Sequence, residues 1–184
     1  MFERLLQFDF RDGLLAFRRA HFLRAAIIGL GLICGKLNAQ DLTIADFEDV
    51  DYGAWKLTGT AFGLGPARGT LPNQMSVIGF QGRGLANSFR GGDDATGRLT
   101  SPSFKLERKY LQFLIGGGGW ENKTCLNLFL DGKVVRTATG SNVVSGGSER
   151  LEQAQWDVAE FLGKTVSLEI VDDATGTWGH INVD

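Results

Sequence analysis

Proline, cysteine and histidine are scarce in this sequence of 184 residues, which contains 3, 2 and 2 of them. The two cysteines, Cys34 and Cys125, lie too far apart for the paired spacing of a zinc site. The sequence also lacks the Gly-x-Ser-x-Gly turn, the phosphate-binding loop and the dinucleotide fingerprint. A Ser-His-Asp triad would have to use His180, because His21 falls in a segment with the pattern of a leader. These absences argue against most familiar classes of enzyme.

Long hydrophobic runs are absent as well. The main apolar run, Ala25–Gly35, has eleven residues, whereas a membrane span needs about 20. Three arginines lie among the seven residues before it, and the small residue Ala39 follows. This pattern is typical of a secretory signal helix cleaved after Ala39. We therefore predict a signal peptide over residues 1–39 and a secreted or periplasmic module over 40–184, with an uncleaved anchor or an amphipathic helix as the alternative.

No block of basic residues is present, and the formal net charge is −2. Removing residues 1–39 leaves 13 basic and 18 acidic residues, a net charge of −5. An acidic exported domain is a poor match for nucleic acid or an anionic membrane surface, so we expect neither as a partner once the signal is cleaved. Cys125 then has no cysteine to pair with, and its apolar neighbours predict a buried thiol.

What the sequence does contain is glycine, 26 residues, between short segments of alternating polarity. Asp131-Gly132 separates two such segments and predicts a type I′ β-hairpin. A long irregular loop is expected over 59–84 and a short helical stretch at 159–162. The strand candidates are 44–48, 54–57, 84–89, 97–100, 104–106, 110–115, 124–130, 133–138, 156–158, 165–171 and 178–184. So many short strands predict an all-β fold, a β-sandwich of jelly-roll type, either galactose-binding-like or concanavalin-like.

Several glycine-rich loops combine aromatic and planar polar side chains, the mixture that sugar recognition requires. Charged and amide groups form paired hydrogen bonds to hydroxyls, and a tryptophan covers the ring. Trp55 and Trp156 lie in strand candidates and are expected in the core, whereas Trp178 fits core and site equally. The candidate carbohydrate-binding residues are Trp120, Arg136, Glu149, Asp172, Asp173, Trp178 and His180.

Catalysis by this chain alone is disfavoured. Glycoside hydrolysis needs two carboxylates on either side of one sugar bond. Asp172 and Asp173 are the obvious pair, but neighbouring residues of a strand point to opposite faces. The alternative for either residue is a turn former, whose side chain accepts hydrogen bonds from the local backbone.

Several long segments resemble a β-sandwich module of secreted fructan-degrading proteins. They include YLQFLIGGG, TCLNLFLDGKVVRTATG, SERLEQAQWDV and EIVDDATGTWGHINVD. Two upstream stretches, IADFEDVDYGAWKLTGTAFGLGPARGTLPNQ and GLANSFRGGDDATGRLTSP, resemble the same module. The module accompanies the catalytic domain of glycoside hydrolase family 32, in levanases and β-fructofuranosidases, and is similar to carbohydrate-binding module family 66. The resemblance covers about 42–184, and the motifs of the catalytic domain are absent.

The resemblance implies a non-catalytic module that binds terminal fructose of levan-type fructan beside a tethered catalytic domain. Arg136 and Glu149 would then bind fructose hydroxyls, Asp172 or Asp173 would accept from others, and Trp120 or Trp178 would cover the ring. Since the last strand candidate reaches the final residue, we expect the sequence to be a piece of a longer protein.

Two further expectations follow from the resemblance. Related sandwiches often hold a structural calcium between their first and last strands, where Glu48 and Asp184 would be its ligands. Solvated edge charges are the alternative for these two residues. The whole module could also be a spacer or protein-binding domain without a sugar ligand, because fold does not fix function. A concave aromatic patch around Arg136, Glu149 and Asp172 would favour sugar binding.

Overall fold

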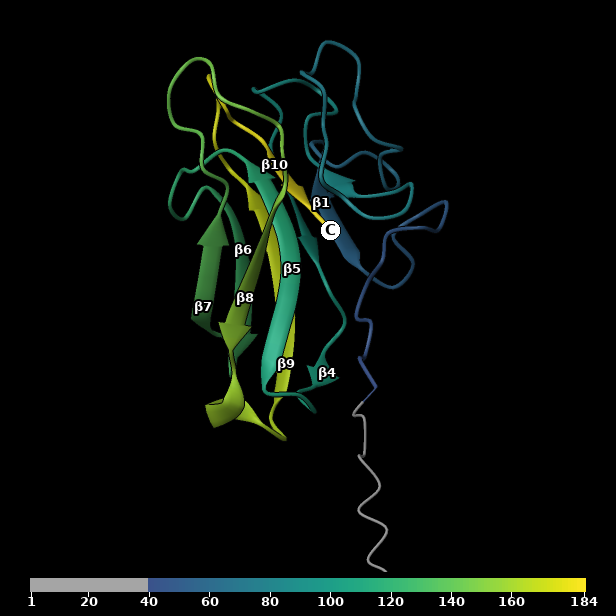
Figure 1. The fold of residues 1–184 in the computed structure, drawn as a ribbon, viewed down its shortest axis with the longest axis vertical. Coiled ribbons are helices and arrows are strands. Elements are labelled where there is room, and N and C mark those ends of the chain that lie inside the picture. The colour runs from purple at the N-terminus through teal and green to yellow at the C-terminus, as the bar shows by residue number, and fades with distance from the viewer. Residues whose placement is uncertain (1–39) are drawn as a thin grey trace, which may run out of the picture. The chain divides into compact units, whose positions relative to one another are not determined.

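Ten strands and one 3-10 turn form the regular structure of the computed structural model, which describes residues 40–184 (Figure 1). The predicted signal peptide lies outside the described residues. Within the described part of the chain, no helix is long and apolar enough to cross a membrane. The elements are β1 (Lys56–Gly59), β2 (Ala86–Asn87), β3 (Gly97–Thr100), β4 (Phe104–Lys105), β5 (Tyr110–Gly117), β6 (Thr124–Leu130), β7 (Lys133–Thr139), β8 (Glu152–Asp157), η1 (Ala159–Phe161), β9 (Thr165–Asp172) and β10 (Ile181–Val183).

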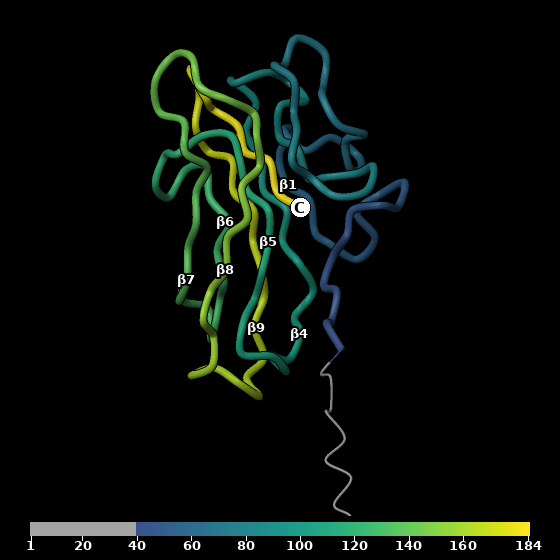
Figure 2. The backbone as a smooth tube through the Cα atoms, in the orientation of Figure 1, coloured from purple at the N-terminus to yellow at the C-terminus, as the bar shows by residue number. Residues whose placement is uncertain are grey.

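The strands form two antiparallel sheets, whose paths are traced in Figure 2. The large sheet has the order β1-β3-β9-β6-β7, and β4 pairs with β9 beyond the end of β3. The small sheet has the order β2-β10-β5-β8. The two sheets pack face to face and enclose one main hydrophobic cluster, which confirms the predicted β-sandwich.

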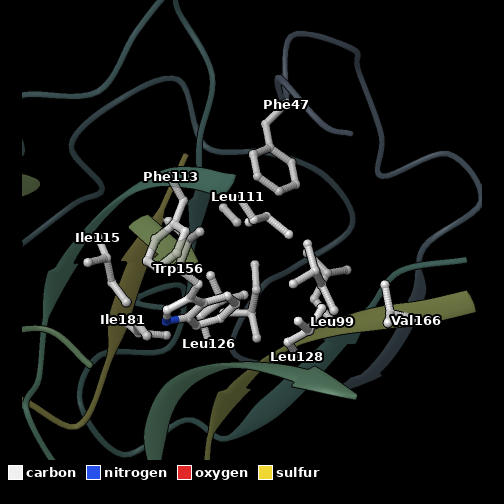
Figure 3. Close-up of a cluster of buried hydrophobic side chains, with 14 of the residues drawn as sticks. Phe47, Leu99, Leu111, Phe113, Ile115, Leu126, Leu128, Trp156, Val166 and Ile181 are labelled. Carbon is white, nitrogen blue, oxygen red and sulfur yellow. The ribbon is translucent and has the colours of Figure 1, made fainter. Parts of the chain in front are cut away.

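The core follows from the alternation of apolar residues along the strands. Leu126 and Leu128 of β6 point inward from the large sheet, and Phe113 of β5 and Trp156 of β8 point inward from the small sheet (Figure 3). The rings of Phe113 and Trp156 have centroids 4.7 Å apart. Each fully buried side chain of this size contributes about 1.5–3 kcal/mol through removal of apolar surface from water. Trp156 is thus a core residue, as predicted.

The predicted hairpin is confirmed. Asp131 and Gly132 have φ values of +51° and +73°, the left-handed conformation that a type I′ turn requires at both positions. β3 and β6 also have the predicted bounds.

The strand predicted at 44–48 is wrong. Phe47 has a φ of +51°, which ends any extended run, and the Asp46 side chain accepts a hydrogen bond from the Glu48 N–H at 3.1 Å. This local bond replaces a bond to a neighbouring strand. The segment has the sequence pattern of a strand because Phe47, although it lies in a loop, packs into the core between two acidic neighbours.

Candidate functional site

His180 joins three loops that are far apart in the sequence. Its Nδ1 lies 2.6 Å from a carboxylate oxygen of Asp93, in the loop before β3. Its Nε2 lies 2.9 Å and 3.1 Å from the two carboxylate oxygens of Glu149, in the loop before β8. Asn182 of β10 donates its amide N–H to Glu149 at 2.8 Å. We call Asp93, Glu149, His180 and Asn182 the histidine cluster.

The geometry of the histidine cluster favours a charged imidazole. A neutral ring would direct one lone pair at a carboxylate, whereas the imidazolium donates from both nitrogens. Burial acts to lower the pKa of His180, but the hydrogen bonds and charges of Glu149 and Asp93 outweigh burial and raise it. Since both nitrogens donate to carboxylates, His180 has no free lone pair for a metal ion. Within residues 40–184, no group of three or more His, Cys, Asp or Glu side chains is placed to hold a metal ion.

Two aromatic rings enclose the imidazole. Phe89 meets His180 edge to face, with centroids 4.8 Å apart, and Trp178 lies 5.5 Å away at an interplanar angle of 30°. The Trp178 indole donates to the backbone oxygens of Val144, at 2.8 Å, and Gly146, at 3.0 Å. Trp178 has a φ of +59°, a strained conformation for a bulky residue. The backbone strain at Trp178 is tolerated because these bonds hold the indole in place.

Close backbone approach at Gly179 completes the enclosure. A Cβ atom at Gly179 would lie 2.3 Å from the Asp93 backbone oxygen, a distance that no side chain permits. Only glycine therefore allows the loop before β3 to reach His180. The result is that Glu149 and His180 are 3% and 2% exposed, while the Asp93 side chain remains 35% exposed.

Asp172 and Asp173 point to opposite faces of the large sheet, as strand alternation predicts. Asp172 is fully buried, and neither of its carboxylate oxygens has a hydrogen-bond partner within the described residues. Burial raises the pKa of Asp172 to about 7, although the nearby Ser88 hydroxyl and the charge of His180 act to lower it. Asp173 lies on the outer side, where it pairs with Arg98. The two carboxylates therefore cannot act together on one sugar.

Trp120 is half-buried, and its indole donates to the backbone oxygen of Thr177 at 3.1 Å. It thereby joins the loop after β5 to the loop before β10, which also carries Trp178. Five predicted site residues thus lie toward this end of the sandwich: Trp120, Glu149, Asp172, Trp178 and His180.

Arg136 lies elsewhere. It donates to the backbone oxygen of Asp157 from Nε at 3.2 Å and from a terminal nitrogen at 3.0 Å, and it pairs with Glu160. Its guanidinium carbon stands 4.9 Å from the centre of the Phe161 ring. Glu149 precedes β8 and Asp157 ends it, so Arg136 and Glu149 lie at opposite ends of that strand. No shared patch of Arg136, Glu149 and Asp172 forms.

Glu48 and Asp184 hold a turn at 81–84. Glu48 accepts the backbone N–H groups of Arg83 and Gly84 at 2.6 Å and 2.8 Å, and Asp184 accepts that of Gln81 at 2.6 Å. Burial raises the pKa of Asp184, and the nearby Glu48 charge adds to the rise. Two carboxylates thus lie close together, and carboxylate oxygens are the type of ligand that calcium prefers. Both carboxylates, however, already accept hydrogen bonds from backbone N–H groups.

Asp93 and Asn182 are the members of the histidine cluster that sequence reasoning missed. Asp93 is 87 positions from His180, and no spacing links them. The only available signal was the polar Gly-Gly-Asp-Asp loop at 91–94.

The comparisons with known proteins find a related sequence. No protein-family model matches the chain. The chain is 45% identical over 137 residues to the protein named "Putative glycosyl hydrolase ecdE" from Aspergillus rugulosus. The match covers 74% of this chain and 19% of that protein, so the chain spans about a fifth of the length of the curated relative that it matches.

Solved structures show weaker likenesses. The K3 adhesin domain of Lys-gingipain from Porphyromonas gingivalis W83 aligns with 79% of this chain and 97% of its own, at 15% identity and a TM-score of 0.47. A cyclase from Fischerella sp. TAU aligns with 73% of this chain and 82% of its own, at 13% identity and a TM-score of 0.44. Both scores are below 0.5, so the fold assignment rests on the two sheets described above.

Proposed function

We propose that residues 40–184 form a non-catalytic carbohydrate-binding module of a larger, exported glycosyl hydrolase, with fructan as its ligand. The observation that carries the proposal is the 45% identity to one fifth of a protein named as a putative glycosyl hydrolase. The relative is much longer than this chain, so a relative of that kind has room for a catalytic domain beside the matched part. The fructan class comes from the resemblance of the strand motifs to the module that accompanies family 32 enzymes.

The arrangement of carboxylates supports a binding role over catalysis. Glu149 and Asp93 are bound to His180, and Asp173 is bound to Arg98. A general acid or base must instead face its substrate with a free oxygen. The module would act by proximity, because a tethered binding domain raises the effective concentration of polymer at a catalytic domain.

A spacer without a ligand is the second candidate, and one observation favours it. Four of the seven predicted sugar ligands are buried: Glu149, Asp172, Trp178 and His180. Buried side chains hold the loops together and are closed to a sugar, so these four support structure in either case.

Affinity electrophoresis of the chain in gels containing levan, inulin or no polysaccharide tests the proposal. We expect levan to retard the folded protein, and retardation by both polymers would indicate general fructan binding. If neither polymer retards a protein that circular dichroism shows to be folded, the spacer function replaces the proposed one. The calcium proposal is tested alongside, since a bound ion at Glu48 and Asp184 would raise the melting temperature above that in chelator.

A further inference from the structure

The outer face of the large sheet contains a hollow that belongs to neither the core nor the histidine cluster. It has a volume of about 260 Å³, close to the lower end of the range for small-molecule sites, roughly 300–1,000 Å³. Its lining includes residues 165–167 at the start of β9 and Ser103 just before β4, and these two strands are labelled toward the bottom of Figure 1. Its lining residues are Thr100, Ser103, Phe129, Asp131, Gly132, Thr165, Val166, Ser167 and Glu169. We call it the outer hollow.

The hollow follows from an interruption in strand pairing. Thr100 of β3 pairs with Glu169, and Phe104 of β4 pairs with Val166 on the same strand, β9. Between them the chain bends at Ser101-Pro102, since a proline has no N–H to donate to the sheet. On the other side of β9, Phe129 of β6 lies opposite Ser167. The bend thus leaves Ser167 flanked by a ring on one side and by a turn on the other.

The side chains of the outer hollow suit a sugar. Four hydroxyl groups, from Thr100, Ser103, Thr165 and Ser167, both donate and accept hydrogen bonds. Phe129 is half-buried and supplies an apolar ring, and Asp131 is an exposed carboxylate.

Glu169 is held in position for a ligand. Its Oε1 accepts from Arg98 at 2.9 Å, and its Oε2 accepts from the Thr100 hydroxyl at 3.2 Å. Its side chain is 16% exposed and lines the hollow, and these two bonds leave further lone pairs of the carboxylate available. Fixing an acceptor before a ligand arrives reduces the entropy that binding costs.

We propose that the outer hollow binds one sugar unit of a neutral carbohydrate, with Glu169 and the four hydroxyls bonding the sugar hydroxyls and Phe129 packing on the ring. The ligand class rests on the proposed function, whereas the location rests on the hollow itself. Two carboxylates in the lining oppose an anionic ligand by repulsion. The volume is large enough for only a small part of a polysaccharide chain, so the site would bind one sugar unit and not a long segment.

The test compares variants of the full chain by affinity electrophoresis at several concentrations of levan and of inulin. Phe129→Ala and Glu169→Gln remove the ring and the charged acceptor. Ser103→Trp is designed to fill the hollow from an exposed position. We expect each of the three to weaken binding by about tenfold or more. Tyr110→Ala and Glu152→Gln are matched controls on the small sheet and should bind like the wild type.

The outcomes separate the two proposals. Weaker binding of the three hollow variants, with unchanged controls and unchanged circular dichroism, supports the outer hollow. If Ser103→Trp binds as well as a wild type that does bind, the proposal that the outer hollow is the binding site is overturned. The proposal of carbohydrate binding then remains. A folded wild type that binds neither polymer overturns both. Should Phe129→Ala or Glu169→Gln fail to fold, Ser103→Trp alone decides.

Discussion

Replacement of Asp172 by asparagine should change how stability depends on pH. Asp172 is fully buried, and its carboxyl has a pKa of about 7 in the folded protein against 3.8 as the ordinary value. Between these values the unfolded chain has released the proton and the folded chain still holds it. The folded state therefore binds more protons, and the free energy of unfolding falls as the pH rises from about 4 to about 7.

The size of this effect follows from the two pKa values. A rise from 3.8 to about 7 corresponds to about 4 kcal/mol, at about 1.4 kcal/mol for each pH unit. An asparagine at position 172 does not titrate. Its amide N–H groups would be buried without hydrogen-bond acceptors, which costs about 1–3 kcal/mol. We therefore expect Asp172→Asn to be less stable than the wild type at pH 4 and more stable at pH 8, each by about 1–3 kcal/mol.

Urea unfolding followed by tryptophan fluorescence at pH 4 to 8 measures this crossing. Asp173→Asn is the matched control, because Asp173 is the exposed neighbour of Asp172. His180 contributes in the same direction but at higher pH. Its raised pKa adds stability that is complete below about 6.5 and is lost as the pH rises through the folded value. Parallel profiles of Asp172→Asn and wild type from pH 4 to 8 would refute the reasoning.

Three other substitutions test the loops and the contact between the sheets. His180→Gln leaves the buried Glu149 carboxylate without its charged donor, so the free energy of unfolding should fall by about 3–5 kcal/mol in urea; a loss below about 1 kcal/mol would contradict the buried ion pair. Gly179→Ala places a Cβ 2.3 Å from the Asp93 backbone oxygen, so the free energy of unfolding should fall by about 1–3 kcal/mol and the melting temperature should fall with it. An unchanged melting temperature would contradict this close approach. Arg136→Ala removes the bonds between β7 and the end of β8 and should cost about 1–3 kcal/mol, measured in urea.

The strands were predictable where the signal is local. β3 and β6 have the predicted bounds because alternation and flanking turns lie within a few residues of each other. The run at 44–48 has the same alternation, yet its only core residue, Phe47, packs from a left-handed conformation. Alternation reports which side chains are buried, and a loop that covers the core can give the same pattern as a strand.

The candidate site was predictable in composition but not in exposure. The sequence indicated Glu149, Trp178 and His180 as polar and aromatic residues of neighbouring loops, and the structure brings these three together. It could not show that the loops close over them, because closure depends on Asp93, 87 positions from His180. Likewise, alternation separates Asp172 from its neighbour, but only the three-dimensional packing determines which of the two faces inward.

The position of β10 has a consequence for the order of folding. β10 is made after every other described strand, yet it lies between β2 and β5 in the middle of the small sheet. Until residues 181–183 leave the ribosome, β2 and β5 each expose an unpaired edge, which can pair with another chain. Most of the pairing that completes this sheet is distant in sequence, so we expect slow folding and a nascent chain that depends on chaperones until its last strand inserts.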